Sequence, residues 1–180
     1  MTVRSTTYGY EQSSEAGRER HVKIPYARLK DTTPTIGDPA CVTSVIVGME
    51  ITGTVITINA TNEEAIINFS EGAIYRHNVR NVLTYNDVGP PQTEATWGLI
   101  NIGDPVFYDE MADTNTAGVC KLSTAPFEAG VPAVPNPRFG TIVMMQDEDA
   151  DDFGAEGKGS AQEGVSDVYG VLQAGLNDTY

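Results

Sequence analysis

Residues that commonly carry out catalysis are scarce in this sequence. Its 180 residues include two histidines, two cysteines and one tryptophan. A Ser/His/Asp or Cys/His arrangement would have to use His21 or His77, and the chain contains no nucleophile motif such as Gly-x-Ser-x-Gly. The glycine-rich stretch 154–160 lacks the spacing of a phosphate-binding loop. We therefore expect no catalytic residues, no cofactor and no enzymatic activity.

Basic residues are also few, and they are unevenly distributed. The chain has 11 Lys and Arg against 25 Asp and Glu, a net charge of −14. Residues 1–30 hold six bases and three acids, a net of +3, so residues 31–180 hold five bases and 22 acids, a net of −17. Nucleic-acid binding needs Lys and Arg against the phosphates, so this composition argues against it. It fits a soluble protein, or one that docks on a basic partner.

Long apolar runs are absent. Residues 1–7 lack the apolar core of a signal peptide, and no run is long enough to span a membrane. We expect a protein that is made in a cytoplasm and does not bind a membrane. Cys41 and Cys120 lie in apolar, strand-like surroundings without a Cys-x-x-Cys pattern, which favours buried free thiols. The sequence alone also permits a bridge between them.

Short β-favouring segments make up most of the chain. Residues 42–47 and 51–58 are rich in Val, Ile and Thr, and similar runs end at Gly, Pro or Asn-Asp turns. We count about eight such strands and no segment with a convincing helical period. This pattern predicts an all-β fold, with a single small β-barrel or β-sandwich domain over residues 36–180.

One tetrapeptide occurs twice. Ile36-Gly37-Asp38-Pro39 and Ile102-Gly103-Asp104-Pro105 are 66 residues apart, and each precedes an apolar, β-favouring segment. Proline suits the first position of a strand, and glycine permits the turn before it. The repeat suggests two related β-units, near 36–80 and 98–175; the alternative is a coincidence of a common turn.

The segment 1–35 shows no periodicity and is expected to be an extended N-terminal arm. A disordered tail is the alternative interpretation. The segment combines tyrosines with basic residues, which are typical anchors of protein interfaces. The candidate partner-binding residues are Tyr8, Tyr10, Arg18, Arg20, Lys23 and Tyr26.

An acidic loop over residues 147–152 is the one candidate metal site. Its aspartates alternate as in a calcium loop, but Asp152 stands where an EF-hand needs Gly and Lys158 where it needs Glu. We therefore expect a solvated loop and no bound metal. The same loop also suits contact with a basic patch of a partner.

The order of these motifs resembles that of the capsid decoration, or cement, proteins of tailed phages, a family long catalogued as a domain of unknown function. The resemblance covers about residues 36–175 and rests on five short motifs. They are Gly37-Asp38, Glu71-Gly72-Ala73-Ile74, Gly103-Asp104-Pro105-Val106-Phe107-Tyr108-Asp109, Gly140-Thr141-Ile142-Val143 and Tyr169-Gly170-Val171-Leu172. The longer N-terminal arm, the loop 85–96 and the acidic loop region 147–164 depart from the family pattern.

This resemblance implies a structural virion protein that decorates and stabilises an icosahedral phage head. Its partners would be the major capsid protein and further copies of itself, as a homotrimer, on the outer surface of the capsid. Two other functions remain open. One is a glycan-binding β-module on the virion surface that uses Trp97 and the tyrosines, and the other is an enzyme that uses the acidic loop and a divalent metal.

Overall fold

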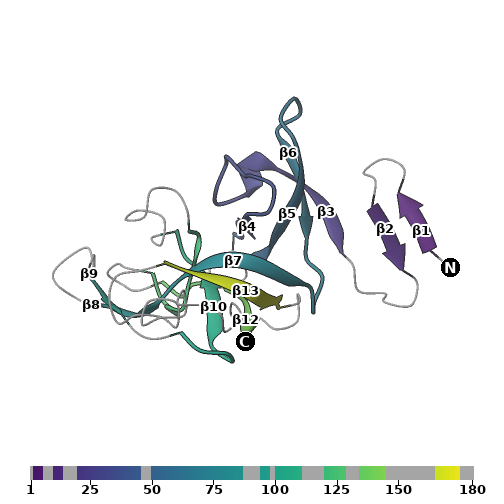
Figure 1. The fold of residues 1–180 in the computed structure, drawn as a ribbon. Coiled ribbons are helices and arrows are strands. Elements are labelled where there is room, and N and C mark those ends of the chain that lie inside the picture. Colours follow the sequence, from purple (N-terminus) through teal and green to yellow (C-terminus); the bar gives the residue numbers. More distant parts are fainter. Residues whose placement is uncertain are drawn as a thin grey trace.

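In the part of the chain that the structure describes, the regular secondary structure is almost all β, as the sequence predicts (Figure 1). The computed structural model describes residues 2–5, 10–13, 20–45, 50–86, 94–97, 100–110, 120–128, 134–144 and 165–174. Within these ranges the strands form a closed five-stranded barrel, a four-stranded sheet and two separate strand pairs. The pairs are β1 (Thr2–Ser5) with β2 (Tyr10–Ser13), and β8 (Val82–Asn86) with β9 (Glu94–Trp97).

The four-stranded sheet is antiparallel throughout, in the order β3-β6-β5-β4. Its strands are β3 (His21–Pro25), β4 (Pro39–Val42), β5 (Ile51–Asn59) and β6 (Glu64–Asn68). A short 3₁₀ helix, η1 (Tyr26–Arg28), follows β3. One face of the sheet carries a compact apolar cluster of Leu29, Ala40, Val55, Ala65, Ile67 and Phe69.

The sheet includes part of the segment expected to be an N-terminal arm. Residues 21–25 pair with β6 along the whole length of β3, and Leu29 is buried in the sheet's apolar cluster. This part of the segment 1–35 is therefore tied to the body by backbone hydrogen bonds and by burial of apolar surface.

The barrel runs in the order β10-β11-β7-β13-β12 and closes on itself. Its strands are β7 (Ile74–Arg80), β10 (Pro105–Tyr108), β11 (Leu122–Ser123), β12 (Arg138–Met144) and β13 (Val165–Gln173). The pair β11–β7 is parallel, and the other pairs are antiparallel. The barrel core is formed by buried side chains of Val79, Ile100, Val106, Tyr108, Leu122, Phe139, Ile142 and Val171, together with Cys41 from β4.

A buried glutamine joins the barrel to the sheet. Gln173, at the end of β13, is 1% exposed, and its Nε2 donates to the carbonyls of Asn68 (2.9 Å) and Ser70 (3.0 Å). Its Oε1 accepts from Thr54 Oγ1 of β5 at 3.0 Å. A buried amide loses its hydration and must be fully partnered, and this one is partnered by the neighbouring sheet.

The first Ile-Gly-Asp-Pro segment forms a tight turn before β4. Asp38 N–H donates to the Thr35 carbonyl at 3.1 Å, and Gly37 has a φ of +92°, which favours glycine. Gly37 N–H donates to the Val55 carbonyl at 2.8 Å, and Val55 N–H donates back to the Asp38 carbonyl at 2.9 Å. The turn is thereby fixed to β5.

The second copy forms the same turn before β10. Asp104 N–H donates to the Asn101 carbonyl at 3.1 Å, and Gly103 has a φ of +100°. Gly103 N–H donates to the Ile142 carbonyl at 2.8 Å, and Ile142 N–H donates back to the Asp104 carbonyl at 3.0 Å. Each contact of the first turn therefore has its counterpart in the second.

The likeness extends into the strands that follow. Each turn leads into a strand that pairs with a Gly-Thr-Val or Gly-Thr-Ile strand, and this in turn pairs with a third antiparallel strand. The register is the same: Thr54 lies opposite Pro39 and Asn68, and Thr141 lies opposite Pro105 and Leu172. A register shift follows Val55 in one unit and Ile142 in the other. The units β4-β5-β6 and β10-β12-β13 thus share one local plan, despite loops of different length.

The buried glutamine generates a test of stability. Replacing Gln173 by leucine leaves two carbonyls and one hydroxyl without their partner, so we expect the free energy of unfolding to fall by about 3 kcal/mol. The control Thr54→Val removes one hydroxyl from the same network and should cost about 1 kcal/mol. Urea unfolding measures both. Equal stability of Gln173→Leu and the parent chain would contradict this account.

Candidate functional site

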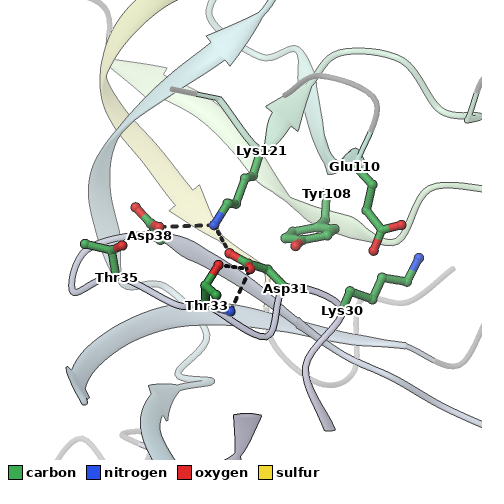
Figure 2. Close-up of a pocket in the computed structure, with 8 residues that line it drawn as sticks. All are labelled: Lys30, Asp31, Thr33, Thr35, Asp38, Tyr108, Glu110 and Lys121. Carbon is green, nitrogen blue, oxygen red and sulfur yellow. Dashed lines mark hydrogen bonds and ion pairs between the residues drawn. The ribbon is translucent and has the colours of Figure 1, made fainter. Parts of the chain in front are cut away.

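A charged pocket lies where the segment after η1 meets the barrel (Figure 2). The cavity has a volume of about 460 Å³. Segment 30–38 forms one wall, and residues at the end of β10 and just before β11 form the other. The lining side chains are Lys30, Asp31, Thr33, Thr35, Asp38, Tyr108, Glu110 and Lys121.

Backbone contacts and short-range side-chain contacts hold the two walls in place. Lys30 N–H donates to the Cys41 carbonyl at 2.9 Å, and Asp109 N–H donates to the Lys121 carbonyl at 3.0 Å. Asp31 Oδ1 accepts from both the backbone N–H (2.8 Å) and Oγ1 (2.9 Å) of Thr33. This is the local turn that aspartate favours, and it orients the Asp31 carboxylate.

Lys121 forms the central ion pairs of the pocket. Its Nζ contacts the Asp31 carboxylate and lies 3.2 Å from Asp38 Oδ2. Burial alone would lower the pKa of Lys121, but Asp31 and Asp38 outweigh it and raise that pKa above its usual value. Burial alone would raise the pKa of Asp31, but Lys121 and Thr33 lower it overall. Both groups are therefore held in their charged forms.

Lys30 and Glu110, the other charged residues of the pocket, take no part in the ion pairs of Lys121. Lys30 Nζ lies 3.4 Å from Glu128 Oε1. Glu110 forms no hydrogen bond or ion pair with any residue that the structure describes. Burial raises the pKa of Glu110, Lys30 opposes this, and the nearby carboxylates of Glu128, Asp109 and Asp31 raise it further.

Tyr108 lies between the two charged groups in Figure 2, with Lys121 and Asp31 on one side and Glu110 and Lys30 on the other. The residue is 1% exposed, and its ring belongs to the barrel core. Burial raises its pKa, and nearby negative groups raise it further, so the hydroxyl stays neutral. No residue in the described ranges forms a hydrogen bond with that hydroxyl.

The candidate partner-binding residues do not gather in this pocket. Tyr8 and Arg18 lie outside the described residues, and Tyr10 begins β2. Arg20 is exposed, and its backbone N–H donates to Ser70 Oγ at 2.8 Å. Lys23 Nζ pairs with Glu64 Oε2 at 3.1 Å, and Tyr26 is half-buried against the sheet's apolar cluster. Their contact with a partner stays a prediction.

Sequence reasoning did not identify the pocket. Its walls are about seventy or more residues apart in the chain, and of the lining residues only Asp38 and Tyr108 belong to motifs that the sequence singled out. Asp104, the counterpart of Asp38 in the second turn, instead accepts the Asn101 N–H at 2.7 Å within its own turn. The repeated motif was therefore the one sequence feature that could have pointed to the pocket. Its turn does not need both aspartate side chains, so one of them can contact another part of the chain.

His77 of β7 is buried in the barrel. It is 5% exposed, and its ring meets Phe139 edge-on, with ring centroids 5.1 Å apart. Burial lowers the pKa of His77 to about 4, so the ring is neutral at pH 7. Its Nε2 has no hydrogen-bond partner among the described residues.

Cys41 and Cys120 are free and buried, as predicted. Burial raises the pKa of each thiol to about 12, so both stay protonated at pH 7. Thiols of this kind are inert packing groups, because the thiolate is the reactive form.

Within the described ranges, no three His, Cys, Asp or Glu side chains are grouped so that they could hold a metal ion. The acidic loop 147–152 lies outside those ranges. No helix in the part of the chain that the structure describes has the length and apolar character needed to cross a membrane. Comparison with protein-family models, with curated proteins and with solved structures finds no match to this chain.

The neutral His77 makes stability dependent on pH. Its pKa is about 4 in the folded chain and about 6.5 when unfolded, so protons favour the unfolded state between these values. The contribution of neutral His77 to the free energy of unfolding is complete above pH 6.5. It is lost as the pH falls towards 4, and the loss amounts to up to about 3 kcal/mol.

Carboxylates also titrate near pH 4, so a matched variant is needed. We expect the unfolding free energy of His77→Gln to depend less steeply on pH between 6.5 and 4 than that of the parent chain. Chemical unfolding at several pH values measures the difference, and parallel curves would contradict the assignment.

Proposed function

We propose that the protein decorates an icosahedral phage head and stabilises it by bridging subunits of the major capsid protein. The observation that carries this proposal is the pair of equivalent turns. Ile36 is 58% exposed and Ile102 is 65% exposed, and both occupy the same position, before the positive-φ glycine.

An exposed isoleucine is unusual at such a position. Turns favour Gly, Pro, Asn, Asp and Ser, each for a backbone reason that isoleucine does not share. Neither Ile36 nor Ile102 belongs to the apolar clusters of the fold. A single exposed apolar side chain needs no explanation, but the same one on two equivalent turns suits two equivalent contacts with a partner.

Two equivalent contacts on one chain provide a mechanism for bridging. A protein that binds only the assembled shell stabilises it by the free energy of that binding. If each turn contacts a different capsid subunit, the second contact is effectively intramolecular and the combined affinity exceeds that of either turn. Many copies around a shell multiply this effect, and a homotrimer on the outer capsid surface would add further contacts.

Charge and fold are consistent with this role. Residues 31–180 carry a net charge of −17, which favours attraction to a basic surface on the partner. The described strands form a closed barrel and a sheet joined through a buried amide. Such a rigid body can transmit force between the subunits that it bridges.

Substitution of the two turn isoleucines tests the proposal. Ile36→Ser and Ile102→Ser should each weaken binding to expanded empty heads of the corresponding phage by about tenfold, because each removes a buried apolar contact. The double variant should bind much more weakly than either. Co-sedimentation with the heads measures bound copies against concentration.

The matched control for these variants is Val45→Ser, since Val45 is 97% exposed and belongs to neither turn. All variants should retain the parent's stability to within about 0.5 kcal/mol, because exposed positions are changed. If the double variant binds the heads as tightly as the parent chain does, the proposal is wrong.

The N-terminal segment provides a second test. Because β3 and Leu29 belong to the body, the deletion should stop before Arg20. Removing residues 1–19 takes away Tyr8, Tyr10 and Arg18. We expect occupancy on the heads to fall at least about tenfold while the melting temperature stays unchanged, because interface anchors are lost and the core is intact. Unchanged occupancy would show that this segment plays no part in docking.

A further inference from the structure

The charges that line the pocket do not balance. Lys121 is paired with Asp31 and Asp38, and Lys30 is paired with Glu128. Glu110 also lines the pocket and forms no ion pair with any described residue. The lining therefore carries three carboxylates against two ammonium groups, and Glu110 is the lining carboxylate that has no ion pair with a described residue.

A second, independent feature points to a polar ligand. Tyr108 is 99% buried, its hydroxyl lines the pocket, and Figure 2 shows that hydroxyl pointing inward between the charged side chains. It has no hydrogen-bond partner in the described parts of the chain. The oxygen is not one of the fully buried atoms that lack a partner, so it opens into the cavity and is accessible to whatever enters it.

Two classes of ligand fit poorly. A metal ion would seek the space between Asp31 and Asp38, and the Lys121 ammonium already lies there. An anion would need free positive charge, and both lysines are paired with carboxylates. A cation with several N–H donors fits best, because it neutralises Glu110 and also donates to the Tyr108 hydroxyl oxygen.

We propose that this pocket binds a guanidinium group, which donates to the Glu110 carboxylate and to the Tyr108 hydroxyl. A planar guanidinium has five N–H donors in a fixed fork, so it can serve a carboxylate and a second acceptor at once. A volume of about 460 Å³ is within the range of small-ligand sites. The group comes either from an arginine side chain of a protein or from a free guanidinium compound.

Calorimetric titration of the full chain at low salt tests this proposal. The probe is Nα-acetyl-arginine methylamide, and its control is the citrulline analogue, which has nearly the same shape but no charge. We expect a dissociation constant of about 1 mM for the arginine probe, as suits one partly exposed charge pair. The citrulline probe should bind at least about tenfold more weakly.

Variants assign the binding to the pocket. Glu110→Gln should weaken the arginine probe about tenfold, and Tyr108→Phe should weaken it by a smaller factor. Glu71→Gln is the matched control, because it removes the same charge from an exposed position that does not line the pocket. Equal binding of the two probes, or equal effects of Glu110→Gln and Glu71→Gln, would overturn the proposal.

A third probe distinguishes the two sources. Agmatine carries the guanidinium on a free amine and lacks the peptide groups of the blocked arginine. Tighter binding of the blocked arginine supports a protein side chain, and tighter binding of agmatine supports a small molecule. The titration contains no phage head, so its failure and the failure of the capsid proposal are distinguishable.

Discussion

The side-chain amide of Gln173 is the constraint on which the rest of this structure depends. From the end of a barrel strand it bonds to a hydroxyl of β5, to the last carbonyl of β6 and to the carbonyl of Ser70 just after β6. The surrounding strands must approach closely for this to happen. A Cβ at Gly53 would overlap the Asn68 carbonyl, and one at Gly140 would overlap the Leu172 carbonyl. The two glycines therefore permit the strand spacing that brings the amide to its partners.

The two units β4-β5-β6 and β10-β12-β13 have the same turn and register, but the aspartates of their turns make different contacts. In the second unit Asp104 caps its own turn, whereas Asp38 of the first unit pairs with Lys121 across the pocket. The backbone geometry of both turns is kept by glycine and by identical hydrogen bonds. Once the backbone holds a turn by itself, its aspartate side chain is free to serve another contact. The Asp38 carboxylate can therefore line the pocket, because its own turn does not need it.

Local chemistry made much of the fold predictable. The β-branched runs and the Gly-Asp-Pro turns predicted the strands around Val55, Val106 and Ile142, and the two cysteines were correctly expected to be buried. Contacts between distant segments were not predictable. Thr52 and Thr54 are polar residues of a β-branched run, yet both are buried because their hydroxyls donate to Arg138 and Gln173 of the barrel. The pocket depends on similar pairings, such as Lys121 with Asp31, which no local pattern encodes.

The position of β13 in the chain has a consequence for synthesis on the ribosome. β13 closes the barrel between β7 and β12 and also supplies Gln173, yet it is translated after every other strand that the structure describes. Strand pairs that are far apart in sequence form late and slowly. Until β13 emerges, neither the barrel nor its junction with the sheet can be completed. The β7 edge that β13 will cover therefore stays unpaired from the synthesis of Arg80 to that of Val165, and during this interval the nascent chain is open to misassembly.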